Sequence, residues 1–252
     1  MAPVQERNQS ASLRRALVVL EHVRDHGGLT LTQLADAVGL TKSTVLRLAA
    51  PLVETGLLER DGKSGAYRLG HGSLRLGQAY LASLDLRAVA AGESRRLLEE
   101  FGETVHLVVH EPPHVVYIDK LENTANVRMA SRIGSRAPLH STGVGKAILA
   151  WQPQDAIPAE LPAVTGHTIT DPVRLAADLA RVRQRGYAVD DRENEPEVRC
   201  VAAPIFDHTD TVHAAISVAG LTSRVTAARV RELGPAVAAA AARISRKLGS
   251  TR

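Results

Sequence analysis

The segment that most constrains the fold is residues 30–55, where two short helical patterns lie on either side of one glycine. The first pattern, residues 31–38, follows a threonine and contains a glutamine at capping-box spacing. It ends at Gly39, a residue type that tolerates the left-handed conformation found after helix C-termini. The second pattern, residues 42–55, follows Thr41, which is a suitable N-cap. Two short helices with a glycine-containing turn predict a helix-turn-helix.

The small and apolar residues of this segment occupy the positions that would hold the two helices together. Ala35 is small where the first helix must pass close to the second, and Val45 would lock the pair from the second helix. The other inward positions are Leu34, Val38, Leu40 and Leu48. An amphipathic pattern from Ser12 to about Asp25 predicts a further helix before them. An ordinary helical hairpin is the alternative interpretation.

Residues 57–69 favour a DNA-binding motif over a plain hairpin of helices. Two short apolar runs flank the sequence Asp-Gly-Lys-Ser-Gly, which predicts a β-hairpin in the position of the wing of a winged helix. The second helix would then enter the major groove, with Arg47 as the first candidate for a base-edge contact and Ser43 as the second. The candidate DNA contacts are Thr41, Lys42, Ser43, Thr44 and Arg47 on the helix, and Arg60, Lys63 and Arg68 on the hairpin.

Pro51 conflicts with the pattern of the second helix. A proline inside a helix removes one backbone hydrogen bond and crowds the carbonyl four residues earlier, here that of Arg47. We therefore expect a kink or an early end of the helix at this position.

The net charge of +4 is concentrated near the N-terminus. Residues 1–75 contain ten Lys or Arg and seven Asp or Glu, whereas residues 76–252 contain 21 and 20. A surplus of positive charge at this end is where a nucleic-acid contact would use it. Such a small surplus supports the DNA-binding interpretation only weakly.

The rest of the chain has the pattern of an α+β domain. Helical periodicity runs from about Ser73 with a break near Asp85, and β-branched runs follow from Thr104. Paired strand patterns alternate with helical stretches at about 145–151, 172–185 and 226–248, which indicates an antiparallel sheet with packed helices. We expect a winged helix over 1–70, a linker helix over 71–87 and a second domain over 88–252.

Two motifs suggest enzymes but lack the residues that the chemistry needs. His110-Glu-Pro-Pro-His114 matches the letters of a zinc-protease motif, yet its two prolines forbid the helix that would bring both histidines to one metal. The stretch 141–147, Ser-Thr-Gly-Val-Gly-Lys-Ala, resembles the end of a Walker loop. It has His140 where the first glycine belongs and Ala147 where magnesium needs a hydroxyl. Gly143 and Gly145 at a helix start still predict a small anion site, where the backbone could approach a ligand closely.

The composition is typical of a soluble protein from a reducing cellular compartment. Cys200 is the single cysteine, so no internal disulfide forms. The first residues are polar, and no apolar run approaches the ~20 residues that cross a bilayer. We expect a cytoplasmic location, no membrane association, no metal and no cofactor.

Six segments of the sequence together resemble the IclR family of transcriptional regulators. They begin with "SLRRALVVLEHV" at Ser12, and they include the helix-turn-helix, "GAYRLG", "SRIGSRAPLHSTGVGKAILA", "RGYAVDDRENEPEVRCVAAPIFD" and "AAISVAGLTSR". The resemblance extends over nearly the whole chain, from about Ser12 to Gly249. It implies an N-terminal winged helix, a linker helix that helps dimerisation, and a C-terminal effector-binding and oligomerisation domain of GAF or profilin-like fold.

Members of this family are dimers, often dimers of dimers, that repress or activate nearby operons in response to small metabolites. The resemblance implies that the backbone amides of Gly143 and Val144 hold the carboxylate of an organic, sugar or aromatic acid. Ala219 stands where some members have a second serine, so one polar contact is missing. The other implied effector contacts are Asp190, Cys200 and Ser217. Met129 and Leu139 are further candidates for the effector site, but their apolar side chains are more typical of the core than of a pocket wall.

Three functions are consistent with these observations, and one is favoured. The favoured function is a non-enzymatic regulator that binds a near-palindromic DNA operator as a homodimer or tetramer and responds to a small-molecule effector. An enzyme that uses the Gly143 loop is the first alternative, but Cys200 and Ser217 have no motif-defined histidine partner. A ligand-binding or scaffold protein without DNA function is the second.

Overall fold

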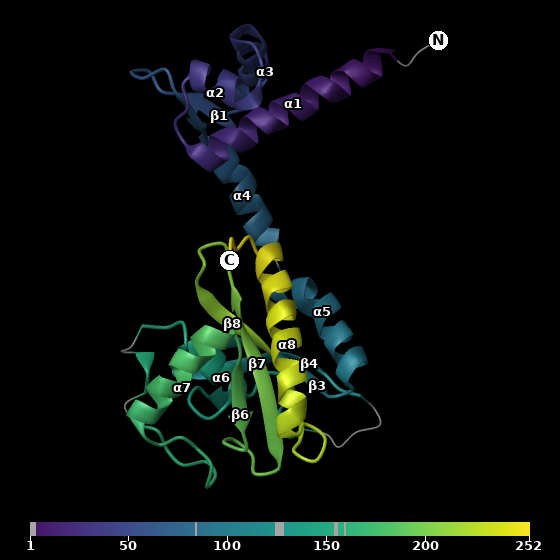
Figure 1. Cartoon of the computed structure of the whole chain (residues 1–252), viewed down its shortest axis with the longest axis vertical. Helices are drawn as coiled ribbons and strands as arrows, with labels where there is room; N and C mark the ends of the chain where they lie inside the picture. Colours follow the sequence, from purple (N-terminus) through teal and green to yellow (C-terminus); the bar gives the residue numbers. More distant parts are fainter. Residues whose placement is uncertain (1–3, 84, 124–128, 154–155, 159) are drawn as a thin grey trace. The chain divides into compact units, whose positions relative to one another are not determined.

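The computed structural model describes residues 4–83, 85–123, 129–153, 156–158 and 160–252 (Figure 1). The chain divides into two compact units, residues 1–83 and 84–252, each with its own hydrophobic core. Helix α4, His71–Ser83, belongs by its contacts to the first unit. The three-part division at residues 70 and 87 stays a prediction.

The first unit is a winged helix-turn-helix. It contains α1 Val4–His26, α2 Leu31–Val38, α3 Lys42–Glu54 and the hairpin of β1 Leu58–Arg60 and β2 Tyr67–Leu69. The core between the helices is formed by fully buried residues from all three, namely Val19, Val23, Leu34, Val45 and Ala49. Helix α1 begins at Val4, so it is longer than the helix expected from Ser12.

Local hydrogen bonds at the helix ends confirm the predicted caps. Both halves of the capping box are present at Thr30 and Gln33, and Gly39 has the left-handed conformation (φ 64°) at the end of α2. The side chain of Thr41 accepts a hydrogen bond from the backbone N–H of Thr44 at the start of α3. These short-range interactions fix the turn of the helix-turn-helix because each one satisfies backbone groups that a helix end leaves unpaired.

Of the two effects expected at Pro51, the early end of α3 is wrong, and the kink stays a prediction. The helix continues to Glu54, and the carbonyl of Pro51 accepts the backbone N–H and the hydroxyl of Thr55 at 3.0 and 2.8 Å. Because the proline lies in the last turn, only the one hydrogen bond to Arg47 is lost. The cap at Thr55 then closes the helix.

The wing is a two-stranded hairpin closed by a tight turn. Leu58 pairs with Leu69 at its base, and an isolated bridge joins Leu29, from the loop before α2, to Tyr67. In the turn, one carboxylate oxygen of Asp61 accepts the backbone N–H groups of Lys63 and Ser64 at 3.0 and 2.7 Å. The hairpin is therefore anchored to the helical core at one end and rigid at its tip.

The second unit is a six-stranded antiparallel sheet with helices on both faces (Figure 1). The strand order is β5-β4-β3-β8-β7-β6. The strands are β3 Thr104–Glu111, β4 His114–Leu121, β5 Arg136–Pro138, β6 Ala188–Asp191, β7 Val198–Phe206 and β8 Val212–Leu221. The helices are α5 Leu86–Phe101, α6 Gly143–Leu149, α7 Pro172–Arg185 and α8 Ala227–Lys247. This architecture confirms the α+β fold class.

Side chains along each strand alternate between the two faces of the sheet, and each face has its own hydrophobic core. In β7, Val201 and Ala203 face the cluster that contains α5 and α8, whereas Ala202 between them faces the cluster that contains α6 and α7. Successive side chains of a strand point to opposite faces, so a sheet covered on both sides has apolar residues at every position. The nearly continuous burial of β7 and β8 follows from this double cover.

The break expected near Asp85 is present, because the Asp85 side chain caps α5 by accepting the N–H of Arg87. The Pro112–Pro113 sequence forms the tight turn between β3 and β4, with Glu111 paired to His114. The two histidines therefore flank a turn between strands and not a helix, as the prolines predict. Within the described residues, no helix has the length and apolarity that a membrane span requires, and no cluster of metal-ligating side chains occurs.

Candidate functional sites: a DNA-reading face and an effector pocket

The first turns of α3 present a polar face outward while the opposite face is buried. Lys42, Ser43 and Arg47 are exposed, and Val45 and Leu48 fix the helix to the core. The Thr41 hydroxyl lies 2.9 Å from the hydroxyl of Thr44 and 3.1 Å from that of Ser43. The hydroxyl groups are therefore gathered at the N-terminus of α3, where the helix dipole favours negative charge such as a phosphate.

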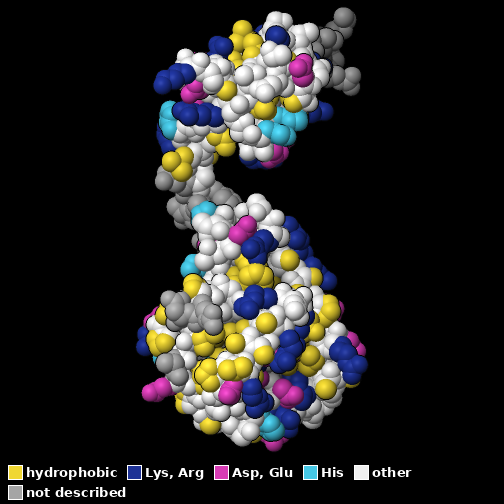
Figure 2. Space-filling model, turned by 60° about the vertical axis from the view of Figure 1, so that its left-hand side comes forward, with side chains coloured by type: hydrophobic (Ala, Val, Ile, Leu, Met, Phe, Trp, Pro, Cys, Tyr) yellow, Lys and Arg dark blue, Asp and Glu magenta, His cyan; other side chains and the backbone are white. Residues whose placement is uncertain are grey.

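The basic residues among the candidate DNA contacts separate into two groups. Lys42, Arg47 and Lys63 are exposed, and their side chains make no hydrogen bond or ion pair with any residue in the described ranges. Arg60 instead donates to the carbonyl of Gly65 at 3.1 Å, and Arg68 pairs with Glu59 at 2.6 Å. The first group is available to DNA, whereas the two arginines of the second group also stabilise the hairpin. Figure 2 shows Lys and Arg side chains on the surface of this unit.

A cavity in the second unit lies where the start of α6 meets the sheet. It opens between strands β3, β4, β7 and β8, and its volume of about 30 Å³ has room for only about two waters. The lining residues are His106, Tyr117, Met129, Ser131, Thr142, Gly143, Val144, Asp190, Asn194, Glu195, Val198, Cys200, Ser217 and Ala219. The structure thus brings together Gly143, Val144, Asp190, Cys200, Ser217 and Met129 of the predicted effector contacts.

Asp190 is the charged group most altered by this environment. Its Oδ1 accepts the backbone N–H groups of Glu193 and Asn194 at 2.7 and 3.3 Å, and its side chain is almost completely buried. Burial raises the pKa of Asp190 to about 7, against the effect of the two hydrogen bonds, and the nearby Glu193 carboxylate acts in the same direction as burial. Asp190 therefore changes charge near neutral pH, and its protonated form can donate a hydrogen bond.

Ser217 and His106 supply two more polar groups from adjacent strands. They face each other across the β3–β8 pairing. Within the described part of the chain the buried Ser217 hydroxyl makes no well-formed hydrogen bond, and its polar neighbour is the Cys200 thiol, a weak partner. His106 Nε2 lies 2.8 Å from the Ser131 hydroxyl. Burial, reinforced by the Lys120 charge, lowers the pKa of His106 to about 4. The imidazole is therefore neutral, and the unpaired hydroxyl is available to a ligand.

The backbone amides at the start of α6 are also available. Gly143 and Val144 both line the cavity, and the Thr142 hydroxyl already accepts the N–H of Gly145 at 3.0 Å. First-turn amides lack intrahelical acceptors, and those of Gly143 and Val144 have no partner among the described residues. Together with the Ser217 hydroxyl, these amides can donate hydrogen bonds to an acceptor in the cavity.

Glycine is required at positions 143 and 145 for packing, which the sequence did not reveal. A Cβ at position 145 would lie 2.3 Å from the carbonyl oxygen of Leu139, and one at 143 would lie 3.1 Å from the Cys200 sulfur. Gly145 therefore allows α6 to pack on the preceding backbone, and it does not line the cavity. The expectation that both glycines allow the backbone to approach a ligand is wrong for Gly145.

Leu139 takes the core position that was the more expected of its two places. It is buried in the core formed with α6 and α7, and it is absent from the cavity lining. Met129, by contrast, lines the cavity and packs on Val198, Cys200 and Ala219. Burial raises the pKa of the Cys200 thiol to about 12, so it is a neutral wall of the pocket.

Sequence reasoning missed His106, Tyr117, Ser131 and Asn194 as lining residues. His106 and Tyr117 lie in edge-to-face contact on neighbouring strands. Their positions in β3 and β4 depend on a register with a bulge between Leu107 and Val108, which no local pattern predicts. The lysine of the Walker-like motif, Lys146, is also buried and ion-paired, a result that its sequence context did not indicate.

A winged helix with an open basic face, joined to a domain with a polar cavity for a small molecule, defines a ligand-responsive transcriptional regulator. Comparison with known proteins agrees. The description "IclR helix-turn-helix domain" matches residues 12–62, and "Bacterial transcriptional regulator IclR C-terminal" matches residues 78–246. The chain belongs to the IclR family and is a DNA-binding regulator controlled by effector binding in its C-terminal domain.

Curated relatives and solved structures cover almost the whole chain. The "Transcriptional repressor IclR" of Escherichia coli is 37% identical over 97% of this chain and 92% of its own length. The "HTH-type transcriptional regulator KdgR" of the same organism is 34% identical, with 95% and 93% covered. The crystal structure of the Agobacterium tumefaciens repressor BlcR matches with a TM-score of 0.82 at 28% identity, covering 98% of this chain and all of that one.

Replacing Gly145 by alanine should destabilise the second unit. The new methyl group would overlap the backbone of Leu139, which cannot move as a flexible side chain can. We expect a loss of about 1–3 kcal/mol in the free energy of unfolding, measured by urea denaturation. Gly92→Ala is the matched control, because Gly92 lies in the middle of α5 with open space around it and should gain up to about 1 kcal/mol. Equal effects of the two substitutions would contradict the packing role.

The raised pKa of Asp190 predicts a pH-dependent stability. The folded state holds the proton up to about pH 7, while the unfolded chain loses it near 3.8, so stability falls as pH rises between these values. Relative to wild type, Asp190→Asn should therefore gain on the order of 2–3 kcal/mol in unfolding free energy from pH 5 to pH 8.

Asp191→Asn serves as the control for this measurement. Its pKa lies below the ordinary value because of the Arg199 guanidinium, so its carboxylate stays ionised over the whole interval. The stability difference of this variant from wild type should not change between pH 5 and pH 8. A flat profile for Asp190→Asn as well would show that Asp190 is ionised in the folded protein.

Proposed function

We propose that this regulator binds a near-palindromic operator as a homodimer or tetramer and represses the adjacent genes until a small carboxylate occupies the C-terminal cavity. The proposal rests on one observation: both the winged helix and the cavity have polar groups without a partner among the described residues. The open cations of the winged helix suit DNA, and the unpaired Ser217 hydroxyl and α6 amides suit an anion. As a repressor of genes it would act in the cytoplasm.

Exposed apolar side chains of the first unit support the oligomeric part of the proposal. Leu13, Leu17 and Val18 of α1 are 39–63% exposed, and Leu74 and Leu76 of α4 are both 63% exposed. Large apolar side chains left open to solvent on two helices are typical of surfaces that another protein covers. A second copy of the chain would cover them and place two recognition helices in successive major grooves, roughly 34 Å apart.

The chemistry of the cavity supports a small acid as the effector. Two backbone amides and a hydroxyl donate from one side, and a protonated Asp190 can donate from the other. The small volume favours a short organic acid over a sugar acid or an aromatic acid, because larger ligands require side chains to move. A relative from Salmonella typhimurium is named "Acetate operon repressor", which agrees with control by small-acid metabolism.

Effector control requires the acid to bind one arrangement of the protein better than the other. A ligand with equal affinity for the DNA-bound and free states would shift nothing, however tightly it bound. The N-terminus of α6 and the β6–β7 connection line the cavity together, so an effector between them could favour one placement of the two segments. We propose this pair of segments as the part of the second unit that responds to the ligand.

Replacing Arg47 by alanine should weaken operator binding without altering the fold. Loss of a base-edge contact is expected to cost about 1–3 kcal/mol of binding free energy and to relax the base preference at one position. Fluorescence anisotropy with a duplex from the region upstream of the gene would measure it. Arg174→Ala, an exposed arginine of α7, is the matched control and should leave affinity unchanged.

The hairpin residue Lys63 should behave differently from Arg47. Lys63→Ala is expected to weaken all sequences alike and to reduce the slope of log affinity against log salt by about one. Indistinguishable results for Arg47→Ala, Lys63→Ala and Arg174→Ala would refute the assignment of α3 as the recognition helix.

Replacing Ser217 by alanine should weaken effector binding. Thermal-shift measurements with acetate, pyruvate and their uncharged amides would show first whether small carboxylates raise the Tm. For an acid that does, Ser217→Ala is expected to lower affinity by about 5–10-fold through loss of one hydrogen bond. Ser73→Ala, in the first unit, is the control. No stabilisation by any small acid would overturn the carboxylate assignment.

A further inference from the structure

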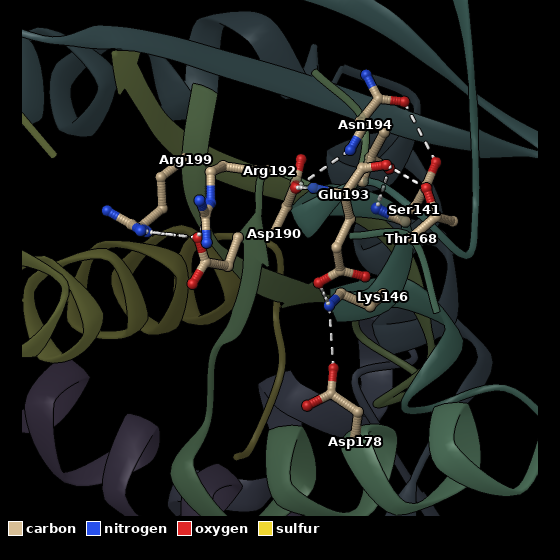
Figure 3. Close-up of polar contacts among 12 residues, drawn as sticks. Ser141, Lys146, Thr168, Asp178, Asp190, Arg192, Glu193, Asn194 and Arg199 are labelled. Atoms are coloured by element: carbon tan, nitrogen blue, oxygen red, sulfur yellow. Dashed lines mark hydrogen bonds and ion pairs between the residues drawn. The ribbon is translucent and has the colours of Figure 1, made fainter. Parts of the chain in front are cut away.

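Lys146 is buried as deeply as the apolar core, although it carries a charge. It lies on α6 with only 1% of its surface exposed, and its ammonium group is 3.0 Å from Asp178 Oδ2 of α7 and 2.5 Å from Glu193 Oε1 (Figure 3). A buried ammonium persists only where opposite charges and hydrogen bonds compensate the loss of water. Lys146 does not line the cavity, so direct ligand contact does not explain it.

The Glu193 end of this cluster is directly connected to the cavity. Glu193 follows β6 in a turn, and the backbone N–H groups of Glu193 and Asn194 both donate to Asp190, which lines the cavity. Figure 3 shows the Glu193 side chain extending from this turn to Lys146 while its backbone lies beside Asp190. The position of the Asp190 carboxyl therefore depends on the turn, and the turn is tied to α6 through Lys146.

Other contacts hold the same turn from the outside. The hydroxyl of Thr168 donates to the carbonyl of Glu193 at 2.6 Å, and the hydroxyl of Ser141 donates to the Asn194 side chain at 3.2 Å. The Thr165 hydroxyl also restrains the backbone, because it donates to the carbonyls of Arg192 and Glu193 at 2.7 and 3.2 Å. None of these bonds involves the Glu193 carboxylate. The ion pair with Lys146 is the contact that fixes this side chain, because its second oxygen, Oε2, is buried without a partner in the described ranges.

The charges around Lys146 make the arrangement depend on this one residue. Lys146 faces two carboxylates, Asp178 and Glu193, and Asp190 lies behind the second. Asp178 has another cation, the largely exposed Arg181 at 3.1 Å, whereas Glu193 has only Lys146 among the described residues. Removal of Lys146 would leave Glu193 and Asp190 as neighbouring buried acids, which repel each other when ionised.

We infer that Lys146 is a positioning residue of the effector cavity, which holds the Glu193 turn so that its amides fix the Asp190 carboxyl toward the ligand. This inference rests on the proposed function for the identity of the cavity as an effector site. It adds that the two walls of the cavity, the start of α6 and the turn after β6, are coupled by one ion pair located outside the cavity.

Hydrogen exchange of the Glu193 and Asn194 amides, followed by NMR on the full-length protein without ligand, tests the inference. In Lys146→Met we expect these two amides to exchange at least about 10-fold faster, because they lose the fixed acceptor on Asp190. In Asp178→Asn, which removes the other partner of Lys146, exchange at both amides should stay within about threefold of wild type. Equal acceleration in both variants would indicate a general loss of stability and would overturn the inference.

A double variant separates positioning from charge compensation. Lys146→Met with Glu193→Gln removes the uncompensated carboxylate, so the fold should recover even if Lys146→Met alone does not fold. The two amides should nevertheless remain fast, because the Glu193 side chain still lacks its ion pair with α6. Wild-type protection in the double variant would show that Lys146 only neutralises charge.

Glu193→Gln alone keeps the Lys146–Asp178 pair. It is expected to accelerate exchange of the two amides about threefold, and unchanged exchange in this variant would also count against the inference.

A pH titration supplies a readout that a purely structural role would not change. The titratable groups that act on or respond to Asp190 are Lys146 on α6, Glu193 in the turn, Cys200 on β7 and Tyr117 on β4. Glu195 and His106 line the same cavity. In ¹³C NMR of the aspartate carboxyls, the midpoint of Asp190 should rise in Lys146→Met and fall in Glu193→Gln. An unchanged midpoint in both would contradict the coupling. Because no effector or DNA is present, these results stand apart from the tests of the proposed function.

Discussion

The close contact between α6 and the central strands is the interaction on which the effector domain depends. It is possible because Gly143 and Gly145 carry no Cβ, which lets the helix start lie against Cys200 and the backbone of Leu139. The same contact brings backbone amides to the cavity and carries Lys146 into the space between α6, α7 and the turn after β6. Packing and recognition therefore share one short segment, and a change that moves the helix affects both.

The winged helix could be predicted almost completely from sequence because its determinants are local. A capping box, a C-terminal glycine and a hairpin turn each involve residues within a few positions of one another, and the structure confirms them. The α+β pattern of the second unit was readable for similar reasons. Pro51 misled because the rule against internal prolines weakens in the last turn of a helix, where few hydrogen bonds remain to be lost.

The effector cavity could be predicted only in part, because its residues meet through the sheet. The resemblance to a known family indicated Gly143, Asp190, Cys200 and Ser217, all of which line the cavity. His106 became visible only with the register that places it opposite Ser217. Gly145 was misassigned because a glycine needed for packing and one needed for ligand approach look the same in a sequence. The ion pairs of Lys146 join residues 32 and 47 positions apart, which no spacing rule detects.

The single cysteine has a consequence for how the regulator tolerates oxidative stress. Cys200 lies in the wall of the cavity, buried, with a pKa of about 12, so almost none of it is thiolate at cellular pH. Peroxides attack thiolates, and this sulfur is both protonated and shielded. Cys200 is therefore a poor target for peroxides, although a sulfur atom stands in the wall of the proposed effector cavity.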